Sequence, residues 1–196
     1  MAELRFFYGT MGSGKSTMAL LIHHNLVLAG QRGLLVTCQE RSDGAVASRL
    51  GVSRPAIELA PGADISQRCR VALSDGPPPQ FLVCDEVQFY TVDQIEQLAE
   101  LVDDDGLDVY AFGLLTDFRG RLFPATARLL ELADHSEVVR SEARCWCGRP
   151  ATHHARLVAG VQVRDGDTIV PGDLGQGDEV TYELRCRRHW HRPDRR

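Results

Sequence analysis

Residues 9–16, which read GTMGSGKS, restrict the fold of this chain more than any other segment. They match the pattern G-x-x-x-x-G-K-[ST], a phosphate-binding loop whose backbone N–H groups surround the phosphates of a nucleotide. Lys15 in this loop is the chain's only lysine, beside 21 arginines. A compact ammonium reaches a phosphate as a point charge where a planar guanidinium would not fit. The placement of the one lysine therefore supports the match.

The flanks of the loop agree with the motif. Residues 4–8 are apolar and aromatic and predict a strand, whereas residues 16–26 predict a helix that ends near Gly30. A loop between a strand and a helix places the helix N-terminus against the phosphates. We expect Lys15 to reach the β- and γ-phosphates and Ser16 to ligate Mg²⁺. The residues expected to surround the ATP phosphates are Gly9, Thr10, Met11, Gly12, Ser13, Gly14, Lys15, Ser16 and Thr17.

Strand and helix patterns alternate through most of the chain. We expect strands at residues 33–38, 81–84, 109–112 and 136–140, helices at 63–74, 91–102 and 126–133, and a loop at 39–47. Such alternation predicts an α/β fold, a three-layer parallel sheet of the P-loop NTPase type. The pattern changes to short β-like pieces and metal-ligand residues after residue 142. We therefore expect an ATP-binding domain at residues 1–142 and a small, mostly β domain at residues 143–196.

Charge and cysteine content limit the class of protein. The net charge is −5, and because residues 143–196 carry +3, residues 1–142 carry −8. We favour a solvated terminus over a nucleic-acid site for the basic tail. No segment reaches the length of a membrane span and no leader precedes the first strand, so we expect a cytoplasmic protein. Cys38, Cys69 and Cys84 are isolated, and buried thiols are expected there.

Two adjacent carboxylates, Asp85 and Glu86, end the apolar strand at residues 81–84. In a chain with a phosphate-binding loop, Asp85 fits the position that holds Mg²⁺. Adjacent carboxylates can divide labour, one serving the metal and the other taking a proton. Glu86 is therefore the candidate general base.

The segment Asp85-Glu86-Val87-Gln88-Phe89-Tyr90 resembles the D-E-x-Q-F-[FY] motif of the zinc-containing, type II thymidine kinases. Residues 9–17, 112–123, 145–149 and 186–189 agree, so the resemblance to the family's bacterial branch runs nearly end to end. It implies transfer of the ATP γ-phosphate to the 5′-hydroxyl of thymidine, giving dTMP and ADP for DNA synthesis. It also implies a homotetramer inhibited by dTTP, with no nucleic-acid or membrane partner.

The resemblance assigns roles by position. Glu86 matches the base, acting with Lys15 and Arg41, and Gln88 joins the nucleotide site. An acid common two residues before that arginine is replaced by Gln39, so the magnesium shell depends on whether Glu40 substitutes. Thymine would be held by Met11, Phe89, Leu114, Phe118, Phe123 and Tyr182. For Leu114 and Phe123 taken alone, simple core packing is the better interpretation, and residues 172–181 resemble a flexible lid.

Two ligand pairs predict a structural zinc site of the Cys₃His type. The ligands are Cys145, Cys147, Cys186 and His189. The C-x-C pair is tighter than usual, but bacterial members of the family share it. A disulfide is the alternative, which a reducing compartment disfavours. His191 competes weakly as the fourth ligand, and His153 and His154 are expected to form a polar surface pair.

Two other functions stay open. One is a kinase of another nucleoside, deoxyuridine above all, because one methyl group gives only modest discrimination. The other is a zinc-bearing ATPase or nucleic-acid-contacting module without kinase activity. That module would depend on Arg185, Arg187 and Arg188.

Overall fold

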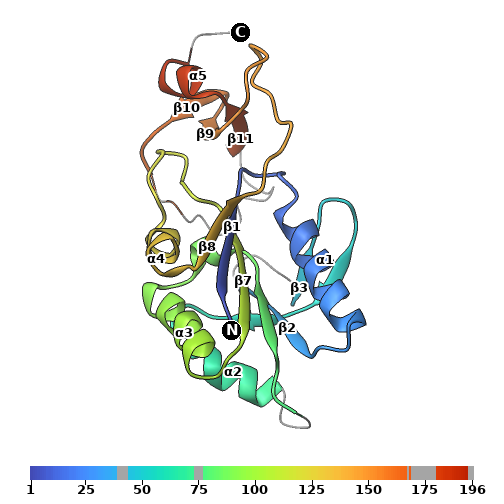
Figure 1. The fold of residues 1–196 in the computed structure, drawn as a ribbon. Coiled ribbons are helices and arrows are strands. Elements are labelled where there is room, and N and C mark those ends of the chain that lie inside the picture. Colours follow the sequence, from blue (N-terminus) through green and yellow to red (C-terminus); the bar gives the residue numbers. More distant parts are fainter. Residues whose placement is uncertain (39–43, 73–76, 167, 169–179, 194–196) are drawn as a thin grey trace.

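The computed structural model describes residues 1–38, 44–72, 77–166, 168 and 180–193 (Figure 1). Its main feature is a six-stranded sheet, with all five strand pairs parallel, in the order β5-β2-β6-β7-β1-β8. The strands are β1 (Leu4–Tyr8), β2 (Gly33–Cys38), β5 (Ile57–Leu59), β6 (Phe81–Cys84), β7 (Asp108–Gly113) and β8 (His135–Val138). The predicted parallel α/β fold is confirmed.

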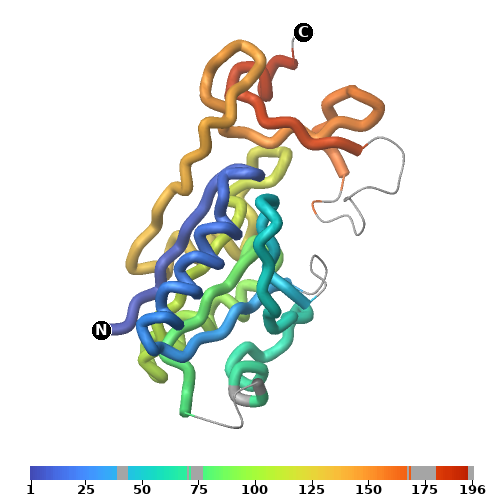
Figure 2. Tube along the Cα trace, turned by 90° about the vertical axis from the view of Figure 1, so that its right-hand side faces the viewer, coloured from blue at the N-terminus to red at the C-terminus, as the bar shows by residue number. Residues whose placement is uncertain are grey.

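Helices cover both faces of this sheet and make three layers (Figures 1 and 2). One face carries α1 (Lys15–Leu28) and a hairpin of β3 (Ala45–Ala47) and β4 (Ser53–Pro55). The other face carries α2 (Ile65–Ala72), α3 (Val92–Asp103) and α4 (Pro124–Leu132). A single turn of 3₁₀ helix, η1 (Val87–Phe89), follows β6.

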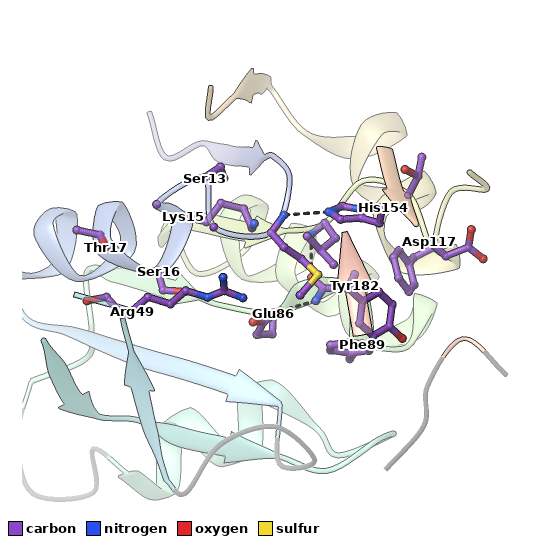
Figure 3. A pocket seen from close by; sticks show the side chains of 18 of the residues that line it. Ser13, Lys15, Ser16, Thr17, Arg49, Glu86, Phe89, Asp117, His154 and Tyr182 are labelled. Carbon is purple, nitrogen blue, oxygen red and sulfur yellow. Dashed lines mark hydrogen bonds between the residues drawn. The ribbon is translucent and has the colours of Figure 1, made fainter. Parts of the chain in front are cut away.

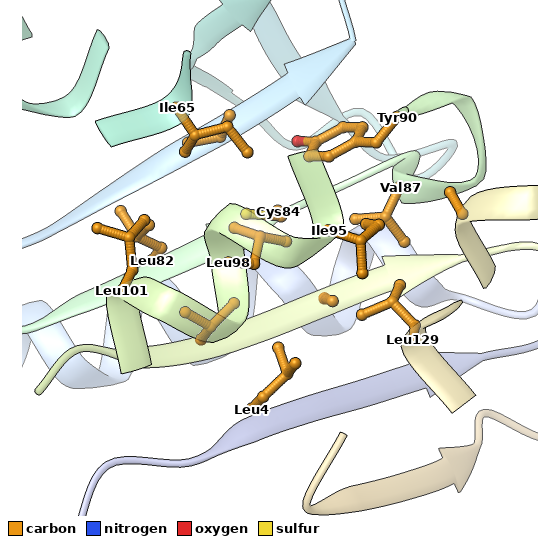
Figure 4. Packing of buried hydrophobic residues seen from close by; sticks show 14 of the residues in the cluster. Leu4, Ile65, Leu82, Cys84, Val87, Tyr90, Ile95, Leu98, Leu101 and Leu129 are labelled. Carbon is orange, nitrogen blue, oxygen red and sulfur yellow. The ribbon is translucent and has the colours of Figure 1, made fainter. Parts of the chain in front are cut away.

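Alternation along the buried strands divides the core between the two faces. In β6 all four residues are fully buried; Leu82 and Cys84 pack toward α3, whereas Phe81 and Val83 pack toward α1. Figure 4 shows the larger cluster between the sheet and α3, where Ile95 and other apolar side chains of that helix meet the strands. A strand buried on both faces reads as a continuous apolar run, which is why β6 is evident in the sequence.

Helix α3 is fixed at its start by a capping box. The hydroxyl of Thr91 accepts the backbone N–H of Gln94 at 3.2 Å, and the Gln94 side chain accepts the N–H of Thr91 at 3.0 Å. Its apolar stripe is buried in the chain's own core, with Ile95 and Leu98 at 0% exposure. The stripe therefore holds the helix on the sheet.

Three short strands depart from the sequence expectations. Residues 45–47, expected within a loop, form β3 and pair with β4, and β5 adds a parallel edge strand beside β2. Each has three residues, too few for an alternating pattern to stand out. The rest of the expected loop, residues 39–43, lies outside the described residues.

The C-terminal part forms a separate small sheet. Its antiparallel strands are β9 (His153–Val158), β10 (Val161–Val163) and β11 (Val180–Arg185), in the order β10-β9-β11, followed by α5 (Arg187–His191). This part lies beyond the carboxyl ends of the parallel strands (Figure 1). A mostly β element was expected there; a domain division at residue 142 stays a prediction. In the described part of the chain, every helix is too short or too polar to cross a bilayer.

Candidate active site and metal centre

The phosphate-binding loop joins β1 to α1 and is shaped by its glycines. Gly12 and Gly14 have φ angles of 72° and 90°, the left-handed region that favours glycine. At Gly9, a Cβ would lie 2.5 Å from the carbonyl oxygen of Val139 and 2.6 Å from Ser13 Oγ. These positions admit glycine because a side chain would strain the loop or collide with its neighbours.

The loop carries free donors suited to an anion. Helix α1 begins at Gly14 without a side-chain cap, unlike α3, so its first N–H groups face the loop. The hydroxyl oxygen of Ser13 is buried without a hydrogen-bond partner in the described structure. A buried donor that lacks a partner is costly, and a phosphate oxygen would satisfy it. The residues present therefore fit a nucleotide phosphate.

The Lys15 ammonium lies folded into this loop. Its Nζ donates to the carbonyl oxygens of Thr10 at 2.9 Å and Gly9 at 3.2 Å, and the residue is 8% exposed. Burial lowers the pKa of Lys15, while the carboxylates of Glu86 and Asp85 oppose that change. The ammonium of Lys15 therefore lies near Asp85 and Glu86, within reach of a phosphate.

Asp85 lies under the loop, at the carboxyl end of β6. It is 4% exposed, and its Oδ1 accepts the backbone N–H of Glu86 at 3.0 Å. Burial, together with the charge of Glu86, raises the pKa of Asp85 to about 6, and the Ser16 hydroxyl opposes this rise. A carboxylate beside a hydroxyl offers the oxygen ligands that Mg²⁺ prefers.

The position of Glu86 is fixed by a left-handed backbone conformation and by a hydrogen bond from Gln88. Its φ is 56°, a left-handed conformation rare outside glycine. Gln88, 3% exposed, donates its Nε2 to the Glu86 carboxylate, and its Oε1 accepts the N–H of Leu114 at 2.9 Å. A Cβ at Gly113 would come within 2.7 Å of that Oε1. Gln88 therefore ties the candidate base to the end of β7.

A cavity of about 440 Å³ joins these groups (Figure 3). Its size is typical of small-ligand sites. One end is formed by the phosphate-binding loop and the other by aromatic and apolar side chains. Of the residues expected to hold thymine, all line it, namely Met11, Phe89, Leu114, Phe118, Phe123 and Tyr182. Of the expected catalytic residues, Lys15 and Glu86 line it, and Arg41 lies outside the described residues.

The other expected nucleotide residues divide by position. Gly12, Ser13, Gly14, Ser16, Thr17 and Gln88 line the cavity. Gly9, Thr10 and Asp85 do not line it. Gly9 and Thr10 hold Lys15, and Asp85 lies beneath Ser16.

Phe118 forms part of the apolar end, from a loop organised by Asp117. Two guanidinium groups lie over its ring, with Arg119 at 5.4 Å and Arg156 at 5.3 Å from the ring centre. The backbone carbonyl of Phe118 accepts the indole N–H of Trp190 at 3.1 Å. The C-terminal part thus fixes one wall of the cavity.

Two basic residues of the cavity, Arg49 and His154, were missed by the sequence interpretation. Arg49 follows β3 in the unexpected hairpin and lies over the loop; a Cβ at Gly12 would be 3.5 Å from its Nη1. His154, expected on the surface with His153, is buried at 5% exposure. That prediction was wrong because β9 turns this face of the small sheet toward the phosphate-binding loop. His153 is half-buried against Trp190, with ring centres 5.0 Å apart.

The four expected zinc ligands come together in the C-terminal part. The ligand atoms of Cys145, Cys147, Cys186 and His189 all lie within 4.8 Å of one another. The two sulfurs of Cys147 and Cys186 are 3.8 Å apart, about the spacing of two thiolates on one tetrahedral zinc with bonds of roughly 2.3 Å. That distance is far beyond a disulfide bond, so the disulfide alternative is not supported.

The surroundings of Cys145 favour a thiolate, whereas the pKa of Cys147 is raised, because the opposing effect of the Arg149 backbone is outweighed by burial and by the side chains of Cys145 and Cys186. Burial acts to raise the pKa of Cys145. The backbone N–H groups of Cys147 and Cys186 and the His189 ring outweigh burial, and they lower the pKa to about 6. The indole of Trp146 stacks on His189 with ring centres 4.7 Å apart. By contrast, Cys38, Cys69 and Cys84 are buried in the main core, as expected.

A parallel α/β sheet, a glycine loop before a helix and a carboxylate pair at the end of β6 define a P-loop nucleotide-binding protein, and its Cys₃His cluster could hold a metal ion. Comparison of the sequence with known families specifies it further. The profile described as "Thymidine kinase" matches residues 2–190. The chain therefore belongs to the thymidine kinase family.

Individual proteins of this family align with the chain over nearly their full lengths. The thymidine kinase of Streptomyces coelicolor is 50% identical over 194 residues, 98% of this chain and 90% of that protein. That of Cutibacterium acnes is 49% identical over 190 residues, 96% and 88% of the two chains. That of Ruegeria pomeroyi is 40% identical over 194 residues, 97% and 94% of the two chains.

Proposed function

We propose that this chain is a thymidine kinase, which transfers the γ-phosphate of ATP to the 5′-hydroxyl of thymidine and releases dTMP and ADP. One observation carries the proposal: the Glu86 carboxylate lies between a phosphate-binding loop and an aromatic pocket within a single cavity. Family membership supports the same reaction. The product supplies a precursor for DNA synthesis.

At the phosphate end, the N–H groups of the loop and the start of α1 hold the triphosphate. Lys15 exchanges its carbonyl partners for phosphate oxygens, which carry more charge. Ser16 and Asp85 would hold Mg²⁺, which neutralises charge on the β- and γ-phosphates. This accounts for the buried carboxylate: with a cation beside it, Asp85 is ionised despite its burial.

At the nucleoside end, the 5′-hydroxyl oxygen attacks the γ-phosphorus as the bond to the ADP oxygen breaks. Glu86 accepts the hydroxyl proton, and Gln88 holds the carboxylate in place. Most of the acceleration in phosphoryl transfer comes from positioning and charge, so a base of modest strength suffices.

The thymine ring fits the apolar end of the cavity. A planar base with one methyl group suits a slot between aromatic side chains such as Phe118 and Tyr182. We propose that residues 172–181 act as a lid over the nucleoside. Of these, Val180 and Thr181 belong to β11, and residues 172–179 lie outside the described residues.

The Cys₃His cluster is proposed to hold a structural Zn²⁺. A cluster with four protein ligands leaves no open position for substrate. The metal joins residue 145 to residue 189, and the small sheet between them has a minor apolar core of its own. Zinc binding therefore contributes folding energy to the C-terminal part.

We also propose a homotetramer located in the cytoplasm. Leu21 and Leu28 lie one heptad apart on α1 and are 56% and 72% exposed, an apolar face suited to a second copy. Sedimentation should give about four times the 21.7 kDa of the chain, and a monomer would contradict this.

We further propose that dTTP inhibits by occupying both ends of the cavity, since it carries a thymine and a triphosphate. Free thiols in the described structure suit a reducing compartment.

The first test compares ADP release with thymidine, deoxyuridine, deoxycytidine and no nucleoside. We expect a rate that depends on thymidine, with deoxyuridine second and deoxycytidine silent. The methyl group contributes roughly 1–3 kcal/mol, so deoxyuridine is a weaker substrate. ATP turnover that ignores every nucleoside would contradict the proposal.

The nucleic-acid alternative loses support from the structure. Arg185, one of its three arginines, is 6% exposed; it donates to Gln162 at 2.6 Å and pairs with Glu183 at 3.0 Å. Its guanidinium also lies over the Trp146 ring. A residue engaged inside the small domain cannot serve a phosphate backbone. Binding of DNA that falls steeply with salt would revive the alternative.

A further inference from the structure

We propose that His154 is a positioning residue for the nucleoside: it accepts the backbone N–H of Met11 and so holds the phosphate-binding loop in the form that receives thymidine. The inference rests on the proposed function and extends it, since it links the C-terminal part to substrate affinity through one hydrogen bond.

The contact joins two distant parts of the chain. The N–H of Met11 lies 2.9 Å from Nε2 of His154, drawn as a dashed line in Figure 3, and the imidazole is 5% exposed. Met11 lies inside the phosphate-binding loop, whereas His154 lies on β9. The residues are 143 positions apart, so neither local structure nor sequence proximity creates the contact.

The same face of the small sheet carries other residues of the cavity. Along β9, His154 and Arg156 share a face because they are two residues apart, and Tyr182 of β11 pairs with Arg156. Arg156 packs on the Phe118 ring, and Tyr182 lines the cavity. His154 extends this face to the phosphate-binding loop through its hydrogen bond with Met11.

His154 and Met11 also stand between two cavities. The second, of about 510 Å³, lies between the loop and the Cys/His part and shares Met11, Arg49, His154 and Tyr182 with the first. The hydrogen bond thus completes a wall of the nucleoside site. Without it, the Met11 backbone loses a partner and the wall can open into the second cavity.

The hydrogen bond from Met11 identifies the tautomer of the His154 ring. An acceptor Nε2 must be unprotonated, so the proton lies on Nδ1. Burial and the positive charge of Lys15 lower the pKa of His154 to about 4, although the Thr116 carbonyl opposes this change. The ring is neutral at working pH, and the N–H of Met11 is committed to it rather than to a phosphate. We therefore expect the contact to affect thymidine more than ATP.

Two substitutions separate this role from simple packing. His154→Leu fills the site but cannot accept a hydrogen bond, whereas His154→Gln offers Oε1 near the position of Nε2. A hydrogen bond contributes about 0.5–1.5 kcal/mol, so we expect His154→Leu to raise the KM and the Kd for thymidine roughly 3- to 10-fold. The kcat and the KM for ATP should change less than about twofold, and His154→Gln should return thymidine affinity to within about twofold of the native value.

The exposed His135 on β8, which does not line the cavity, provides the control, His135→Leu, which should leave every parameter unchanged. Zinc content and the unfolding midpoint are measured for each variant, and thymidine binding is titrated directly. Equal losses in His154→Leu and His154→Gln, or an unchanged thymidine Kd in His154→Leu, would overturn the inference. Failure of the native protein to phosphorylate thymidine would instead count against the proposed function.

Discussion

Glu86 decides the chemistry at the scale of one residue. Its carboxylate is the group placed to take the proton of the 5′-hydroxyl, and Gln88 holds it there. Glu86→Gln keeps the size and removes the base, so we expect kcat to fall roughly 100- to 10,000-fold. Thymidine affinity and zinc content should stay at native values. The control is Glu100→Gln, on the exposed side of α3. Native turnover by Glu86→Gln would exclude the assigned base.

His154 also gives a dependence of stability on pH. Its pKa is about 4 in the folded chain, below the ordinary value of 6.5. Between those values the unfolded chain binds a proton that the folded chain does not, so this residue makes stability fall as pH falls from 6.5 toward 4. Between pH 7.5 and 5 the contribution is about 2 kcal/mol.

Urea unfolding of the native protein and His154→Gln at these two pH values isolates this effect. The native protein should lose more stability than the variant on acidification, by about that amount, because other titrating groups are common to both. Equal losses would mean that His154 titrates normally in the folded chain.

At the scale of elements, the β3–β4 hairpin brings an arginine over the phosphates. Arg49 lines the cavity, and the described structure gives it no hydrogen-bond or ion-pair partner. We expect it to contact a phosphate of ATP, so Arg49→Ala should lower kcat/KM for ATP about tenfold or more. Arg54→Ala, on β4 of the same hairpin, should have little effect because that side chain is exposed and reaches only the Ser53 carbonyl. Equal effects of the two variants would argue for hairpin stability rather than phosphate contact.

The same hairpin shows what the sequence can and cannot predict. The phosphate-binding loop follows a strand of five mostly apolar residues, and Asp85 and Glu86 follow a strand of four apolar residues, so the fold and the acidic end of the site are evident from local patterns. Arg49 follows a strand of three residues, which carries too little pattern to be recognised.

His154 fails as a prediction for a different reason. Its neighbours in sequence are polar, and its burial comes from a contact with Met11 across 143 positions, which no local pattern contains. Four cysteine and histidine ligands were predictable because their chemistry demands proximity whatever the intervening chain.

At the scale of the whole molecule, the Cys/His cluster supports the walls of the nucleoside site. Two of the hydrogen bonds that cross from the C-terminal part reach residues lining the cavity: His154 accepts the N–H of Met11, and Trp190 donates to the carbonyl of Phe118. Removing zinc should loosen both, so we expect the Kd for thymidine to rise more than tenfold, while the helical signal of α1–α4 in circular dichroism persists.

Zinc is removed with a chelator, which is then exchanged away before thymidine is titrated without Mg²⁺. Adding Zn²⁺ back should restore the Kd, and this recovery serves as the control. Native thymidine affinity in the zinc-free protein would show that the small sheet holds its position without the metal.

The buried ammonium of the phosphate-binding loop has a consequence for covalent labelling. Lys15 is the single side-chain amine of the polypeptide, and its Nζ is engaged by two carbonyl groups. An amine-selective acylating reagent therefore has one side-chain amine target in each molecule, and the yield at Lys15 measures the fraction of loops in which that nitrogen is free. Mass spectrometry of one peptide would then report how often this loop opens, without any substrate or enzymatic assay.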